Sequence, residues 1–263
     1  MTMKAAPSGE ARRAAPAHNA MYTVDILIPT ARFVFSVEDG RIDVLPEFHS
    51  PEAFVQYRRL RGERPVVGMT TFPNTVLLRG ARTIVVDPGL PLQNAPVVRA
   101  LEAWGLSPAD VDLVVLTHAH LDHAGACADL MAPVAVHALE TRSPSWTLVG
   151  GLLELLPVRR LSGEQGELAP GVAWARTPGH CDGHISLRVD TAAGPVVLCG
   201  DTIGPGRAEF DALRPSGPAA AELLASWQRI RAWGPAQIIA GHLPPFAPQA
   251  AAQPEVQEGA VLD

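Results

Sequence analysis

Apolar and polar residues alternate in short runs along much of the chain, and these runs predict β-strands. Residues 22–29 and 31–45 alternate in this way, and Asp39-Gly40 is the expected turn inside the second run. Residues 74–89 predict two further strands. Because successive side chains of a strand point to opposite faces, this alternation is typical of sheets that bury one face.

Two segments between or after these runs predict helices. Residues 94–104 carry a proline in the expected first turn and are followed by a glycine. Residues 217–234 place Leu223, Trp227 and Ile230 on one helical face. Strands that alternate with helices indicate a layered α/β fold.

Residues typical of metal ligands follow four apolar runs. The run at 111–116 leads into THAHLDHAG at 117–125, which has three histidines and one aspartate. Three later runs end at His180, Asp201 and His242. Loops at one sheet edge bring distant residues into one cleft, and imidazole and carboxylate are common zinc ligands. The pattern therefore predicts a metal site, whereas a single histidine would fit a solvated loop.

Composition narrows the class of protein. A length of 263 residues favours one domain, and a net charge of −6 argues against a nucleic-acid partner. Three scattered cysteines without close pairing are typical of a reducing compartment, so we expect a cytoplasmic protein. Apolar runs are too short to span a membrane, so no membrane partner is expected.

The two ends differ from the middle in composition. We expect a disordered N-terminal tail over 1–20, for which a transit peptide is the alternative, and a flexible C-terminal tail over 248–263. The expected domain is 21–247.

The motifs THAHLDH, TPGH, CGD and AGH, in this order, resemble those of the metallo-β-lactamase-fold hydrolases over about residues 66–245. The resemblance implies a four-layer αβ/βα sandwich with metals at one sheet edge. It implies that Asp201 bridges two divalent metals, with zinc expected and iron or manganese as alternatives. It assigns the first metal to His118, His120 and His180, and the second to Asp122, His123 and His242.

The chemistry of such sites explains the residue types. A dinuclear site supplies a metal-bridging hydroxide at neutral pH, and Asp122 would also act catalytically by passing a proton to the leaving group. Asp87 matches the family's early aspartate and would support the metal loops. We expect His184 to support ligands and not to bind metal.

The remaining histidines and the loops over the site are harder to assign. His137 ends a strand near the site or lies on the surface, and His18 and His49 have no expected role. Segments 143–160 and 203–218 would cover the metals. Their apolar residues form either a pocket rim or ordinary core packing; these are Trp146, Leu148, Leu152, Leu153 and Phe210. Arg207 or Arg214 would supply a polar contact to the substrate.

Departures from family patterns select the branch. The best-known zinc β-lactamases have a cysteine ligand where this chain has Asp201, so penicillins are not the expected substrate. Only 40 residues separate Asp201 from His242, too few for the nuclease branch with an inserted domain. Glyoxalase II appends a helical domain, but 21 residues follow His242. The lactonases carry a tyrosine where this chain has Gly204.

The sequence thus predicts a small-molecule hydrolase for an ester, lactone or thioester. A mononuclear-iron persulfide dioxygenase and a small metal-dependent ribonuclease are the alternatives. A non-catalytic binding module fits less well, because all seven ligand residues are present. Whether the chain forms a homodimer stays open.

Overall fold

The computed structural model describes residues 21–36, 42–45, 66–91, 95–204 and 206–249. Asp39-Gly40, His18 and His49, together with the expected tail 1–20 and most of the other expected tail, lie outside these ranges.

Three sheets form the framework. The first sheet has the order β1-β5-β6-β7-β8-β9, in which β1, β5 and β6 pair antiparallel and β6 to β9 pair parallel. The second has the order β10-β11-β12-β13-β14, and only its β13–β14 pair is parallel. The third has the order β3-β2-β4.

The strands of the first sheet are β1 (Thr23–Ile28), β5 (Thr75–Arg79), β6 (Thr83–Val86), β7 (Leu113–Val115), β8 (Val134–His137) and β9 (Val158–Leu161). Those of the second are β10 (Gln165–Ala169), β11 (Val172–Arg176), β12 (Ile185–Val189), β13 (Val196–Gly200) and β14 (Gln237–Ala240). Those of the third are β2 (Ala31–Ser36), β3 (Ile42–Leu45) and β4 (Val66–Phe72).

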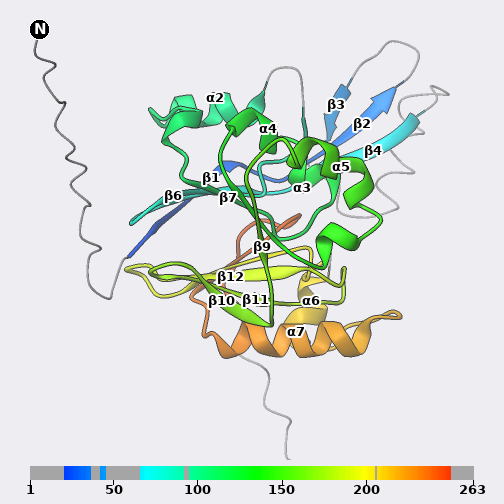
Figure 1. The fold of residues 1–263 in the computed structure, drawn as a ribbon. Helices are drawn as coiled ribbons and strands as arrows, with labels where there is room; N and C mark the ends of the chain where they lie inside the picture. Colours follow the sequence, from blue (N-terminus) through cyan, green and yellow to red (C-terminus); the bar gives the residue numbers. More distant parts are fainter. Residues whose placement is uncertain (1–20, 37–41, 46–65, 92–94, 205, 250–263) are drawn as a thin grey trace, which may run out of the picture.

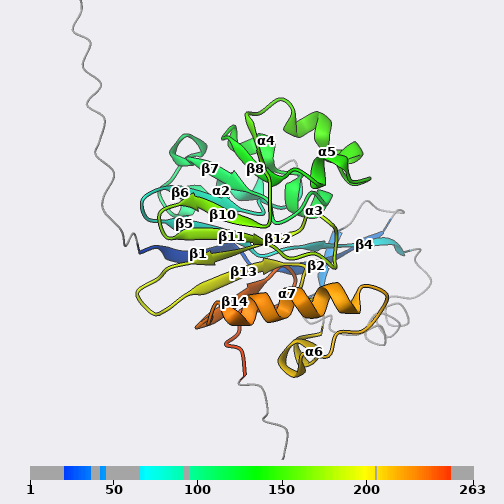
Figure 2. The ribbon, with the colours of Figure 1, turned by 60° about the horizontal axis from the view of Figure 1, so that its bottom comes forward.

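Helices cover the outer faces of the two larger sheets (Figures 1 and 2). Over the first sheet lie α2 (Pro96–Ala103), α3 (Leu121–Ala124), α4 (Cys127–Leu130) and α5 (Trp146–Leu153). Over the second lie α6 (Arg207–Ala212) and α7 (Ala220–Ala232). Short 3-10 turns occupy Pro108–Asp110 and Glu140–Arg142.

Three apolar clusters hold the layers together. The inner faces of the two sheets share one cluster, in which Val86 and Val115 of the first sheet pack with Trp174 and Leu187 of the second. A second cluster joins the first sheet to its helices, and a third joins β13 and β14 to α6 and α7. This order of helix, sheet, sheet and helix confirms the four-layer αβ/βα sandwich.

The two predicted helices are present, and a glycine lies two residues beyond the end of each. Gly105 and Gly234 follow α2 and α7 with φ of 73° and 60°, the left-handed geometry that ends a helix most easily at glycine. Trp227 and Ile230 are buried, and Leu223 packs against the same cluster, as the apolar face predicts.

The structure decides between alternatives that the sequence left open at three residues. Phe210 is fully buried in the third cluster and does not form a pocket rim. His137 is not a surface residue: it is 4% exposed, its Nε2 lies 3.1 Å from the Gly163 carbonyl, and its ring packs on Trp174. Leu153 is buried by α5 packing, whereas Leu148, on the opposite face, is 69% exposed.

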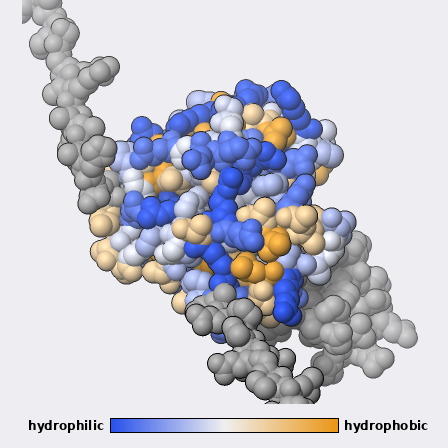
Figure 3. Space-filling view, turned by 90° about the horizontal axis from the view of Figure 1, so that it is seen from below, coloured by the Kyte–Doolittle hydropathy of each residue, from blue (hydrophilic) through white to orange (hydrophobic). Residues whose placement is uncertain are grey.

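No helix in the described part of the chain is both long and apolar enough to cross a membrane. On the described surface seen in Figure 3, hydrophobic residues form small patches separated by hydrophilic ones.

Candidate metal centre

The sheet topology brings the predicted ligands to one edge. Strands β6 and β7 run parallel, as do β13 and β14, and β11 runs parallel to β13 because both pair antiparallel with β12. The loop after β7 carries His118 and His120, and the loop after β11 carries His180. Asp201 directly follows β13, and His242 lies two residues beyond β14. Side chains distant in sequence therefore meet in one cleft.

Four of these residues form the first ligand group. His120 Nδ1 lies 2.9 Å from His118 Nε2 and 3.1 Å from His180 Nε2. Asp201 Oδ2 lies 3.5 Å from His180 Nε2 and 3.9 Å from His118 Nε2. One ligand atom from each residue lies within 4.8 Å of the others, a spacing that could hold a metal ion.

Asp122, His123 and His242 form the second group. The Nε2 atoms of His123 and His242 are 3.4 Å apart, and Asp122 Oδ2 lies 3.3 Å from His242 Nε2 and 3.9 Å from His123 Nε2. Asp122 and His123 lie on the short helix α3, so one turn of chain supplies two of the three.

Asp201 contacts both groups. Its Oδ1 lies 3.3 Å from His123 Nε2, and its Oδ2 lies 3.4 Å from His242 Nε2, besides the contacts with His118 and His180. The structure thus brings together all seven residues that the sequence predicted, with Asp201 between the two groups.

Asp87 orients the rings of His118 and His123, which is the supporting role that the family resemblance implied. Its Oδ2 accepts a 2.7 Å hydrogen bond from Thr117 Oγ1 and lies 2.9 Å from His123 Nδ1. Since the Thr117 hydroxyl proton goes to Asp87, its oxygen is left to accept from His118 Nδ1, 3.1 Å away. His118 therefore turns an unprotonated Nε2 toward the other ligand atoms.

This arrangement fits a cation. Several nitrogen and oxygen acceptors face one another at 2.9 to 3.9 Å, and the buried Asp201 Oδ1 has no hydrogen-bond partner among the described residues. Buried acceptors of this kind are costly unless a donor or a metal meets them. The donor set of imidazole and carboxylate is the one zinc and similar metals prefer.

The pKa values of the ligands follow from burial and charge. Burial holds the pKa of His118 well below its usual value, and that of His180 is lowered for the same reason. Burial would lower the pKa of His242 too, but hydrogen bonds to Asp122 and Asp201 raise it to about 9. Burial opposes ionisation of Asp201, yet neighbouring His123 keeps its pKa well below the usual range. The Asp201 carboxylate is therefore charged at neutral pH.

His184 supports the site without facing it. It is fully buried; its Nε2 accepts the Asp201 N–H at 3.2 Å, and its Nδ1 lies 2.9 Å from the hydroxyls of Thr177 and Thr202. Burial and the neighbouring His180 lower its pKa to about 3, so the ring is neutral. With both ring nitrogens engaged, this geometry supports the expected positioning role.

Sequence reasoning missed Glu140. This carboxylate is 1% exposed; Oε2 accepts the Ala119 N–H at 2.8 Å and Oε1 accepts the Gly183 N–H at 3.0 Å. It therefore ties the loop of His118 to the loop of His180. An acidic residue shortly after an apolar strand was its only signal in the sequence.

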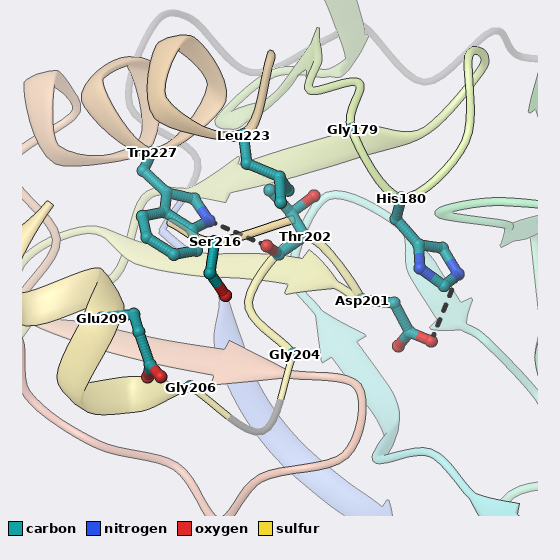
Figure 4. Close-up of a pocket in the computed structure, with 10 residues that line it drawn as sticks. All are labelled: Gly179, His180, Asp201, Thr202, Gly204, Gly206, Glu209, Ser216, Leu223 and Trp227. Atoms are coloured by element: carbon teal, nitrogen blue, oxygen red, sulfur yellow. Dashed lines mark hydrogen bonds and ion pairs between the residues drawn. The ribbon is translucent and has the colours of Figure 1, made fainter. Parts of the chain in front are cut away.

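A cavity of about 290 Å³ opens beside the first group (Figure 4). Segment 203–218 contributes to it as expected, but none of its described lining residues comes from 143–160. Arg207 and Arg214 do not line it either, and Arg207 instead pairs with Asp211 at 3.3 Å. The lining residues are Gly179, His180, Asp201, Thr202, Gly204, Gly206, Glu209, Ser216, Leu223 and Trp227.

The family model of the metallo-beta-lactamase superfamily matches residues 69–242, and the chain belongs to that superfamily. It is 34% identical over 183 residues to human metallo-beta-lactamase domain-containing protein 1, covering 67% of this chain and 64% of that protein. It is 37% identical over 130 residues to hydroxyacylglutathione hydrolase of Cupriavidus taiwanensis, covering 45% and 44%.

A third relative is the N-acyl homoserine lactonase of a Bacillus species, 34% identical over 107 residues, covering 39% of this chain and 42% of that protein. The chain thus spans less than two thirds of the length of each of these relatives. The family prediction is confirmed, and the prediction of a hydrolase agrees with the names of two of these relatives.

Solved structures share the fold. A putative metallo-beta-lactamase from Thermotoga maritima has a TM-score of 0.60 at 22% identity, covering 87% of this chain and all of that one. A quorum-quenching N-acyl homoserine lactone hydrolase has the same score at 21% identity, covering 87% and 94%. At such identities the likeness establishes the fold alone.

Proposed function

We propose that this protein is a dinuclear-metal hydrolase that cleaves a small ester, lactone or thioester. The observation that carries the proposal is Asp201, whose carboxylate contacts histidines of both ligand groups. A carboxylate in that position can bridge two dications and set their spacing.

The named relatives support the reaction class. One is called a hydroxyacylglutathione hydrolase and another an N-acyl homoserine lactonase, and both names denote hydrolysis of an acyl compound. The chain's net charge of −6 supports a small-molecule substrate over a nucleic acid. We place this activity in the proposed domain 21–247 and in the cytoplasm, and we propose zinc as the metal.

The residues have separable tasks in this proposal. Metals held by the two groups would lower the pKa of a water from 15.7 to about 7 and stabilise negative charge on the attacked carbonyl oxygen. Asp87 and Thr117 fix the ring of His118, while Glu140 and His184 fix the loops around His180 and Asp201.

Asp122 is placed to move the proton. A hydrogen bond from His242 outweighs burial and lowers the pKa of Asp122, so the carboxylate is ionised at neutral pH. It lies beside the second group with its side chain 24% exposed, so it can take a proton in the cleft and give it to a leaving group.

Metal analysis combined with a substrate panel tests the proposal. Protein purified without added metal should contain about two zinc ions per chain and hydrolyse acyl substrates faster than nitrocefin or structured RNA. One iron per chain with oxygen consumption on glutathione persulfide would instead assign a dioxygenase. Cleavage of RNA with every acyl substrate inert would assign a ribonuclease.

A further inference from the structure

The charged side chains that line the cavity beside the metal centre include carboxylates but no lysine or arginine among the described residues. His180 and Asp201 lie at the end that adjoins the ligand groups, and Glu209 of α6 lines another part of the wall (Figure 4). Once metals offset the charge of Asp201, Glu209 is the remaining ionised group of this lining.

The Glu209 carboxylate has room at the wall and no competing cation. The carboxylate lies against Gly206, where a Cβ atom would meet Glu209 Oε2. Glu209 forms no ion pair within the part of the chain that the structure describes, and the nearby Arg207 is paired with Asp211. Its charge is therefore available to a ligand.

An apolar wall completes the cavity. The indole of Trp227 donates its only N–H to the Thr202 carbonyl at 2.8 Å, so the part of the ring that lines the cavity has no polar atom to satisfy. Leu223 lies beside it (Figure 4). A cavity lined by a carboxylate and by aromatic and aliphatic side chains has the chemistry that recognises alkylammonium groups.

We infer that this cavity is a subsite for the arm of the substrate beyond the scissile carbonyl, and that Glu209 makes it select cationic or neutral arms over anionic ones. The inference rests on the proposed acyl hydrolase and names its substrate class: a small ester, lactone or thioester with an amine or quaternary ammonium group. The volume of about 290 Å³ suits an arm of this size.

Three thioesters of one thiol test the inference. Their acyl chains are γ-(trimethylammonio)butyryl, the neutral isostere with a tert-butyl group in place of the ammonium, and the analogue with a sulfonate there. Zinc-loaded enzyme is assayed at low ionic strength, and the measured quantity is kcat/KM for the ammonium substrate divided by that for its neutral isostere.

This ratio should fall about 1.4- to five-fold in Glu209→Gln, because an exposed ion pair contributes roughly 0.2–1 kcal/mol. Glu209→Lys should lower it further and improve turnover of the sulfonate substrate. Glu102→Gln is the matched control, since it removes the same charge from an exposed site on α2 and should leave the ratio unchanged.

Calorimetric binding of the matching non-hydrolysable methyl ketones separates the two proposals. If the neutral thioester is hydrolysed while substitution of Glu209 changes neither the kcat/KM ratio nor binding of the ammonium ketone, charge selection by Glu209 is wrong and the proposed hydrolase stands. If no thioester is cleaved while ammonium binding depends on Glu209, the subsite stands and the hydrolase is wrong. Failure of both measurements overturns both.

Discussion

Asp201 is the residue on which the two ligand groups depend, since it lies within 4 Å of ring nitrogens from both. In the proposed dinuclear site, Asp201→Asn keeps the shape of the side chain but removes a negative charge from between the two metal ions. Activity should fall by orders of magnitude and metal content should drop, measured as esterase rate and zinc per chain. A variant with two metals and near-normal turnover would contradict the bridging role.

His184 offers the contrasting substitution at the residue scale. Its ring accepts the Asp201 N–H and does not face the ligand atoms, so His184→Ala should leave metal bound at high zinc concentration. Loss of such a support typically costs about 10- to 100-fold in metal affinity or activity. Loss of one metal at saturating zinc would make His184 a ligand.

We expect Glu140 to position the loops of His118 and His180, as His184 positions Asp201. Glu140→Gln keeps one acceptor oxygen but replaces the other with an amide that cannot accept from Ala119 or Gly183. Zinc affinity should weaken by about 10- to 100-fold, measured by competition with a chelator. Glu154→Gln, at an exposed position after α5, is the control and should bind zinc normally. Equal zinc affinity in both variants would remove Glu140 from the site.

At the scale of elements, the end of β13 shows how a strand terminus positions a ligand. Gly200 has φ of 45°, and a Cβ atom there would lie 2.6 Å from His184 Nε2 and 2.6 Å from Thr117 Oγ1. A glycine therefore lets the strand turn out of the sheet directly before Asp201 while both supporting side chains stay close.

Gly200→Ala should lower the free energy of unfolding by about 2–4 kcal/mol, which combines left-handed backbone strain with overpacking. Gly105→Ala is the control, because Gly105 has φ of 73° but open space around its Cβ position, and it should cost only about 1–2 kcal/mol. Urea unfolding of both variants measures the difference. Equal costs would show that crowding at the end of β13 is unimportant.

At the scale of the whole molecule, the buried histidines link stability to pH. Burial lowers the pKa of His118 and holds that of His184 near 3, against 6.5 for an unburied histidine. Below about pH 6.5 the unfolded chain therefore binds protons that the folded chain does not. The contribution of these two histidines to stability is present above this pH and is lost as the pH falls.

The metal-free protein should accordingly lose roughly 1.4 kcal/mol per pH unit for each such histidine as the pH falls from about 6.5 toward 4. Urea midpoints in the presence of a chelator measure this slope. His184→Gln should make the slope shallower, since one of the histidines is removed. An unchanged dependence of stability on pH in His184→Gln would show that His184 does not resist protonation in the folded protein.

Much of the fold and the site could be predicted from local patterns. Periodicity marks strands and helices because each element buries one face, and glycines mark the ends of α2 and α7 because they adopt positive φ at low cost. Ligand-type residues after four apolar runs predicted the site because sheet edges gather strand ends. All seven residues lie together as a result.

Only the tertiary structure decided what each side chain touches. The sequence left Phe210 as either a pocket-rim or a core residue, and the third cluster buries it. His137 packs on Trp174 because β8 lies opposite that residue. Glu140 supports loops 21 and 43 residues away, and no local pattern encodes partners at such separations. The sequence determined which residues have metal-binding chemistry and which faces are apolar, because these depend on residue type and short spacing. The packing of the four layers determined which residues support the ligands and where the cavity lies, because both depend on which faces of distant helices and strands come into contact.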